Sequence, residues 1–196
     1  MSIVYFDTET GGLLPQHPTI QIGAIAVSPD WSEVESFECK ILFDEAAADP
    51  QALKVNHYDP EVWKRDGVSE RRALEDFAAF LNRHRSVDMV SKRTGNPYSV
   101  ARLAGHNAAT FDGPRLFDAF RRQEMFCPAH PQVLCVLQRA MWFAMETGTA
   151  LKSLKLEELA RHFGVPVQDA HDALADCRMA IGVARAMADT KETADW

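Results

Sequence analysis

The chain has 196 residues, of which 46% are hydrophobic and 25% are charged, a composition typical of one globular domain with a buried core. No segment has the roughly 18–20 consecutive apolar residues of a membrane span, and no basic and then apolar leader opens the chain, so we expect a cytoplasmic protein without a membrane partner. The net charge of −7 argues against a protein that coats long duplexes, because such proteins carry a basic surface.

The first half of the chain predicts an antiparallel meander of three strands followed by a helix. The strands are expected over residues 3–7, 19–28 and 33–43. A loop follows, with a helical turn near residues 60–64. Ser69 then predicts the N-cap of a helix that ends near Arg85, because the apolar residues after it recur with helical spacing.

The second half predicts alternating strands and helices. Residues 91–99 are polar and are expected to form an exposed loop. Strands are expected over residues 101–105 and 132–136, and helices over residues 114–123, 136–146, 153–164 and from residue 170 onward. Residues 188–196 predict a polar tail. The pattern predicts a single three-layer α/β domain over residues 1–187, in which helices flank a mixed central sheet.

Two carboxylates, Asp7 and Glu9, end the first predicted strand in the segment "IVYFDTETGGL". Side chains at positions i and i+2 of a strand point to the same face, so these two like charges would share one small volume. A solvated strand end that runs into a Gly-Gly turn would explain a lone pair of this kind. The alternative is a divalent cation between them, which needs further carboxylates from elsewhere in the chain.

Two later residues, Asp112 and Asp176, could complete such a site. Asp112 in "GHNAATFDGPRL" lies between a predicted strand and a helix, where it could equally be an acidic N-cap. Asp176 in "HDALADCRM" lies among small apolar residues in the first turn of the last helix. A buried charge there is costly without a counter-ion or metal. Asp172 is expected to cap this helix, which places His171 on the loop that leads into it.

In their order along the chain, these motifs resemble the DEDDh-type, or DnaQ-like, 3′-5′ exonucleases of the ribonuclease H-like superfamily. The first motif matches at Asp7, Thr8, Glu9, Thr10 and Leu13, and the last motif matches at His171 and Asp176. The middle motif departs from the family pattern, because Asp112 follows His106 by six residues where many members have five. The resemblance covers residues 3 to about 187.

The resemblance implies a ribonuclease H-like fold and a metal-dependent 3′-5′ exonuclease. The enzyme would hydrolyse phosphodiester bonds at the 3′ end of single-stranded or frayed DNA and release nucleoside 5′-monophosphates. Asp7, Glu9, Asp112 and Asp176 would hold two Mg²⁺ or Mn²⁺ ions, since hard oxygen ligands favour these ions over zinc. The resemblance makes His171 the general base, and Thr10, Leu13 and Asn107 contacts to the substrate.

Several alternatives remain open at this point. The substrate could be RNA, and the chain could be a proofreading subunit that acts with a polymerase or another replication or repair partner. A non-catalytic nucleic-acid-binding scaffold would be signalled by the loss of an acidic residue, but all four carboxylates and the histidine are present. The segment 83–122 contains eight basic and three acidic residues, which suits an enzyme that binds a few phosphates. A hydrolase of nucleotides or other phosphoesters would be distinguished by an assay on labelled oligonucleotides.

Overall fold

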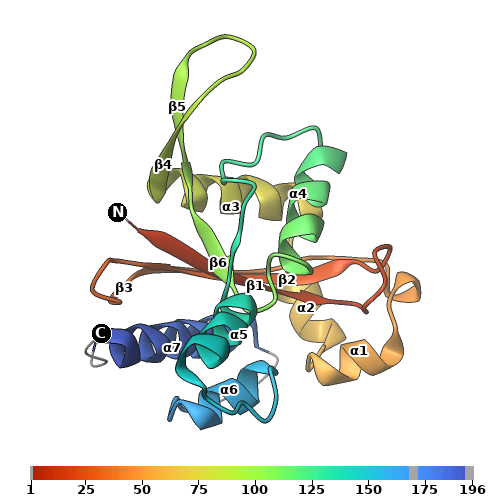
Figure 1. The fold of residues 1–196 in the computed structure, drawn as a ribbon. Coiled ribbons are helices and arrows are strands. Elements are labelled where there is room, and N and C mark those ends of the chain that lie inside the picture. Colours follow the sequence, from red (N-terminus) through yellow and green to blue (C-terminus); the bar gives the residue numbers. More distant parts are fainter. Residues whose placement is uncertain (1, 168–171, 193–196) are drawn as a thin grey trace.

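A computed structural model describes residues 2–167 and 172–192, and its centre is a mixed five-stranded sheet with the strand order β3-β2-β1-β6-β7 (Figure 1). The strands are β1 (Ile3–Thr10), β2 (Thr19–Val27), β3 (Glu33–Lys40), β6 (Leu103–Gly105) and β7 (Leu134–Cys135). β1, β2 and β3 form the predicted antiparallel meander, whereas β6 and β7 add to the β1 edge in the parallel sense. The predicted mixed sheet is therefore confirmed.

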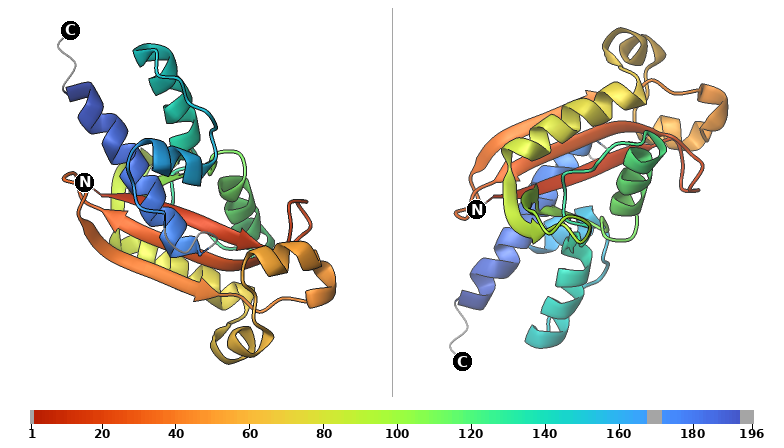
Figure 2. Two further views of the ribbon diagram at one scale, coloured as in Figure 1. Left: turned by 90° about the horizontal axis from the view of Figure 1, so that it is seen from below. Right: turned by 90° about the horizontal axis from the view of Figure 1, so that it is seen from above.

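Helices cover both faces of this sheet. α3 (Glu70–Arg83) and α4 (Asp112–Arg122) lie on one face, and α5 (Val136–Thr147), α6 (Leu156–His162) and α7 (Ala173–Glu192) lie on the other. Figure 2 shows α3 and α7 on opposite sides of the strands. The predicted three-layer α/β fold is confirmed.

Two apolar cores form, one between each helical layer and the sheet, because side chains along β1 alternate between its faces. Phe6 packs with Phe77 and Phe120 on the side of α3 and α4. Tyr5 packs with Phe143 and Met187 on the side of α5 and α7. Burial of each large side chain of this kind contributes about 1.5–3 kcal/mol.

The connection between β3 and α3 is more helical than the sequence predicted. It contains the short 3₁₀ helix η1 (Glu45–Ala47) and the helices α1 (Pro50–Val55) and α2 (Pro60–Asp66). An aspartate caps each one, namely Asp44, Asp49 and Asp59, and a proline opens α1 and α2. Only α2 was predicted, as a single turn; the Asp-Pro pairs are the signal for both α1 and α2.

The prediction of an exposed loop over residues 91–99 is wrong in part. β4 (Arg85–Val90) and β5 (Pro97–Ala101) pair antiparallel, and only residues 91–96 form the turn between them. The strands were missed because polar residues interrupt their alternation, as in the hydrogen bond from Ser99 Oγ to Asp88 Oδ1 at 2.8 Å. In Figure 1 this hairpin extends away from the sheet, beyond α3.

Several predicted boundaries also shift. β1 continues to Thr10, so Asp7 and Glu9 lie within the strand and not at its end. α6 begins after Lys155, later than the predicted cap at Ser153. α7 continues to Glu192, which makes residues 188–192 helical where a tail was expected. In the part of the chain that the structure describes, no helix has both the length and the apolar character needed to cross a membrane.

Candidate active site

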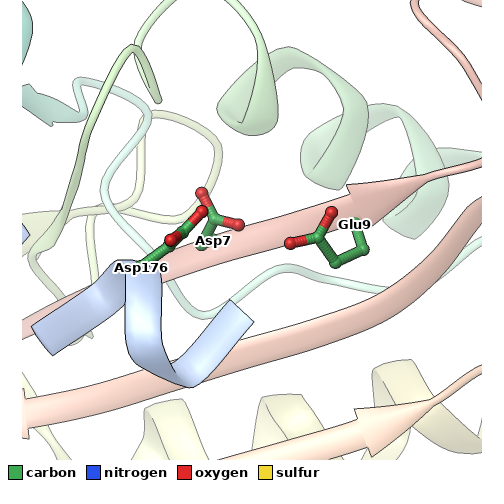
Figure 3. A group of neighbouring side chains, drawn as sticks. All are labelled: Asp7, Glu9 and Asp176. Atoms are coloured by element: carbon green, nitrogen blue, oxygen red, sulfur yellow. The ribbon is translucent and has the colours of Figure 1, made fainter. Parts of the chain in front are cut away.

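Three carboxylates from the two ends of the chain meet on one face of the sheet. Oxygen atoms of Asp7, Glu9 and Asp176 all lie within 4.8 Å of one another. Figure 3 shows Asp7 and Glu9 on β1 and Asp176 on the first part of α7, with the carboxylates turned toward one another. Asp7 and Glu9 share this face because they are two residues apart in a strand, as the sequence predicted.

Gly23 allows α7 to reach this face. It lies directly opposite Asp7 in the β1–β2 register. A Cβ atom at position 23 would lie 2.7 Å from the Cβ of Ala173 and 2.9 Å from the backbone nitrogen of Leu174. The first turn of α7 therefore rests directly on the backbone of β2. The sequence analysis missed this role, although a lone glycine inside a strand pattern is a signal of close backbone approach.

Asp172 fixes where α7 begins. Its Oδ1 accepts hydrogen bonds from the backbone nitrogens of Leu174 at 3.1 Å and Ala175 at 3.0 Å, which confirms the predicted N-cap. Asp176 consequently lies in the first turn of α7. The aligned peptide dipoles give the start of a helix a partial positive charge, which offsets part of the repulsion between Asp176 and the other carboxylates.

Asp112 lies nearby and is held in place from the opposite side of β1. It is the first residue of α4 and not its N-cap, which is Phe111. Asp112 Oδ1 accepts a hydrogen bond from the backbone nitrogen of Thr8 at 3.2 Å and a short one from the Thr8 hydroxyl. Thr8 thus orients the Asp112 carboxylate, a role that the sequence analysis did not assign to it.

The electrostatics show that these carboxylates resist ionisation when no cation is bound. Burial, together with the nearby charges of Asp176 and Asp112, raises the pKa of Glu9 to about 7. Burial also raises the pKa of Asp112 to about 6, against the opposing effect of the Thr8 hydrogen bonds. The pKa of Asp7 is raised well above its ordinary value by burial and by Asp112, Glu9 and Asp176.

Comparison with known proteins gives a family match over the second half of the chain. Residues 98–184, which include Asp112 and Asp176, match the family model for Exonuclease. The resemblance to the DnaQ-like exonucleases is confirmed. Comparison with curated protein sequences gives no match.

Solved structures of exonucleases share the fold. E. coli exonuclease I in complex with a dT13 oligonucleotide matches with a TM-score of 0.73 and 20% identity over 94% of this chain and 40% of that one. The zinc-bound form of the E. coli exonuclease I complex with single-stranded DNA has a TM-score of 0.74 and 20% identity over 98% of this chain and 41% of that one. A moderately thermophilic exonuclease I from Methylocaldum szegediense has a TM-score of 0.72 and 21% identity over 98% of this chain and 41% of that one. This chain thus spans about two fifths of the length of these structures.

In this exonuclease fold, the end of β1 and the loop after it carry Thr10 and Leu13, which were predicted to meet the substrate end. Thr10 is buried, and its hydroxyl donates a hydrogen bond to the carbonyl of Gly12 at 3.0 Å. Gly12 has φ +149°, a conformation that residues with side chains rarely adopt. The turn leaves Leu13 81% exposed.

Arg115 of α4 holds this loop and was not predicted. Its Nη2 donates a hydrogen bond to the carbonyl of Leu13 at 2.6 Å. The guanidinium carbon lies 3.8 Å from the centre of the Phe111 ring, within the range of a cation–π interaction. Arg115 therefore ties the exposed Leu13 to the helix that begins with Asp112.

The remaining residues singled out in the sequence are Asn107, His106 and His171. Asn107 adopts a left-handed conformation with φ 54°, and its Oδ1 accepts a hydrogen bond from the Thr110 hydroxyl at 2.6 Å. Burial lowers the pKa of His106 to about 4, so its imidazole stays neutral at neutral pH. His171, the predicted general base, lies outside the described residues.

The carboxylate cluster fits divalent cations. Magnesium and calcium bind oxygen ligands at about 2.0–2.6 Å, so oxygens that share one ion lie within about 4–5 Å of one another. The 4.8 Å limit on the Asp7, Glu9 and Asp176 oxygens meets this requirement. The donor set is all oxygen, which suits hard ions such as Mg²⁺ and Mn²⁺.

These pKa values predict that the metal-free protein becomes less stable as pH rises from about 4 to 8. The folded-state pKa values of Glu9, about 7, and Asp112, about 6, exceed their ordinary values of 4.5 and 3.8. In this interval the folded state binds more protons than the unfolded state, so the unfolding free energy falls as pH rises. The contribution of Glu9 alone is on the order of 3 kcal/mol.

Chemical denaturation in EDTA at about pH 5 and about pH 8 measures this effect. Mn²⁺ or Mg²⁺ added at the higher pH should raise the unfolding free energy by about 2.7 kcal/mol when its concentration is a hundredfold above its dissociation constant. Glu9→Gln should flatten the pH dependence. A metal-free protein that is more stable at the higher pH would contradict the prediction.

Proposed function

We propose that the protein is a metal-dependent 3′-5′ exonuclease that removes nucleoside 5′-monophosphates from the 3′ end of single-stranded or frayed DNA. The observation that carries this proposal is the convergence of Asp7, Glu9 and Asp176 within 4.8 Å, with Asp112 close enough to raise the pKa of Asp7. Such a cluster is costly without cations, so its retention in a folded domain favours a metal-binding role.

The carboxylates would divide the work of holding two Mg²⁺ or Mn²⁺ ions. Asp7, Glu9 and Asp176 would bind metal directly, since their oxygens lie within 4.8 Å of one another, and Asp112, already hydrogen-bonded to Thr8, would act through water. Two such ions, when bound, lower the pKa of the attacking water and stabilise the charge that builds on the phosphate and on the leaving oxygen.

His171 would take the proton from the attacking water. It directly precedes Asp172, the N-cap of α7, in the sequence, and Asp176 of the cluster follows one turn later. The ordinary pKa of histidine, about 6.5, suits a general base near neutral pH. His106 is a poor alternative, because burial keeps its pKa at about 4.

The 3′ end of the strand would lie against the loop after β1. Glu9 and the backbone at Thr10 would meet the terminal 3′-hydroxyl, and the exposed Leu13 would contact the terminal base. The hydrogen bond from Arg115 to the Leu13 carbonyl supports this arrangement, because it holds the loop beside the cluster. Contact between an apolar side chain and a base face tolerates any base, so we expect weak sequence preference.

DNA is the favoured substrate and RNA is the alternative. The E. coli exonuclease I structures that share this fold contain dT13 and dA16 oligonucleotides, and another is a complex with SSB-Ct. By analogy, a role in DNA repair or replication beside a partner protein is part of this proposal.

The test uses labelled single strands with a 3′-hydroxyl, with a 3′-phosphate and without ends. Mononucleotides should accumulate with Mg²⁺ or Mn²⁺ and disappear with EDTA. The 3′-phosphate strand should be cut much more slowly, because its charge would face the Glu9 carboxylate, and a circular strand should survive. Rapid linearisation of the circle would show an endonuclease and would contradict the proposed contacts to the 3′ end. Cleavage of free nucleotides alone would indicate another phosphoesterase.

A further inference from the structure

The hairpin of β4 and β5 borders an open cavity, away from the carboxylate cluster. Its volume is about 640 Å³, within the range of sites that bind ligands. The cavity is lined by Met89, Val90, Ser91, Lys92, Arg93, Thr94, Asn96, Pro97, Tyr98 and Phe126. Except for Phe126, these residues belong to the hairpin, and Phe126 comes from the segment between α4 and β7.

Aromatic and apolar groups are exposed in this cavity. The rings of Tyr98 and Phe126 are 6.2 Å apart with an angle of 70° between their planes. Phe126 is 69% exposed and Val90 is 64% exposed. Exposed apolar side chains that cluster in this way mark a surface that another molecule covers.

The charge of the same cavity is positive. Lys92 and Arg93 line it, and no carboxylate does. The chain as a whole carries 28 acidic and 21 basic residues, so a lining with two cations and no acid runs against its composition. The nearest acidic residues in the sequence are Asp88, which accepts a hydrogen bond from Ser99, and Glu124. An occupant with negative charge is favoured over a neutral or basic one.

The topology places this cavity beyond the N-terminal end of β1, which is the end farther from the carboxylates. β5 leads into β6, whose Leu103 pairs with Val4, whereas Asp7 and Glu9 lie in the second half of β1. At about 3.3 Å per residue of strand, the path from Asp7 to Val4 and then from its partner Leu103 to Asn96 in the hairpin turn is roughly 33 Å. At about 3.4 Å per stacked nucleotide, only a strand of about ten nucleotides or more would reach both places.

We propose that the hairpin cavity binds single-stranded nucleic acid several nucleotides upstream of the 3′ end. A base stacks on the exposed face of Phe126, supported by Tyr98, while Lys92 and Arg93 pair with flanking phosphates. Cationic grooves with aromatic platforms bind single strands in this manner, without sequence preference. The identity of the ligand rests on the proposed function, but the binding itself can be measured without cleavage.

The test compares a trinucleotide with a strand of about 20 nucleotides, which is long enough to reach the hairpin. Binding is measured in EDTA by fluorescence anisotropy, so that no cleavage occurs. Phe126→Ala should weaken binding of the long strand about 5- to 150-fold, the loss expected for one stacked base. Lys92→Gln with Arg93→Gln should lower the slope of log affinity against log salt by about 0.7 per lost phosphate contact. Trinucleotide binding should not change.

Matched controls come from elsewhere on the surface. Trp142→Ala removes another exposed aromatic side chain, on α5, and Arg121→Gln removes an exposed cation on α4. Neither substitution should alter the difference in binding affinity between the long strand and the trinucleotide. Unchanged long-strand binding in the hairpin variants would overturn the proposal, and so would an equal loss for the trinucleotide.

Other outcomes separate this proposal from the proposed function. A wild-type protein that binds the long strand through the hairpin but releases no mononucleotide with Mg²⁺ would support the cavity and contradict the exonuclease. If the wild type releases mononucleotides but the hairpin variants bind the long strand as tightly as the wild type does, the result would support the exonuclease and contradict the cavity. An acidic peptide provides the last comparison. If the hairpin variants bind this peptide more weakly than the wild type does, while the peptide displaces no DNA from the wild type, the cavity binds a protein partner and the proposal is wrong.

Discussion

Asp7→Asn is expected to lower the cleavage rate at least about 10³-fold, because loss of the carboxylate at the centre of the cluster removes several kcal/mol of charge stabilisation through the bound cations. The variant should remain folded. Its metal-free form should melt a few degrees higher at about pH 8, since removal of a disfavoured charge of about 1 kcal/mol shifts the midpoint by about 2–4 °C in a domain of this size. Oligonucleotide cleavage and thermal denaturation in EDTA measure the two effects.

Asp66→Asn is the matched control for this variant. Asp66 is exposed and pairs with its neighbour Arg65, and such surface pairs contribute only about 0–1 kcal/mol. Its activity and its response to metal should equal those of the wild type. If Asp7→Asn unfolds the protein, or leaves more than a few per cent of the activity, then Asp7 has a structural role and the proposed metal site is wrong.

His171→Ala is expected to lower kcat by about 10²–10⁴, the usual contribution of a positioned general base, while the affinity for Mn²⁺ stays the same. The wild-type rate should fall as pH drops below about 6.5, because the protonated imidazole cannot accept a proton. This acidic limb should be lost in the variant. Stopped-time assays across pH and calorimetric metal titration provide the two measurements.

His162→Ala serves as the control, because His162 is an exposed residue at the end of α6. It should leave both kcat and the pH profile unchanged. A tenfold weaker dissociation constant for Mn²⁺ in His171→Ala would show that His171 is a metal ligand and not the base.

Local patterns predicted most of the framework. The strand β2, the Ser69 cap of α3 and the Asp172 cap of α7 each depend on residues close together in the chain, and each is present in the structure. The face shared by Asp7 and Glu9 also follows from strand geometry alone. These features could be predicted because their causes are local.

Features that depend on distant contacts could not be predicted in the same way. The Thr8 hydroxyl faces Asp112 across the interior of the fold, and nothing near Thr8 in the sequence indicates that partner. The role of Gly23 depends on Ala173, which packs against it from 150 residues later in the chain. The hairpin was missed because its strands are polar and pair with each other outside the main sheet.

The contact between Gly23 and the start of α7 has a consequence for the order of events during synthesis. Asp7, Glu9 and Gly23 leave the ribosome well before Asp176, which lies about 150 residues later in the chain. The N-terminal strands can therefore pair long before α7 exists to dock on them. A growing chain presents an incomplete set of carboxylates until α7 has been made. Assembly of the carboxylate cluster thus depends on the docking of α7 on β2.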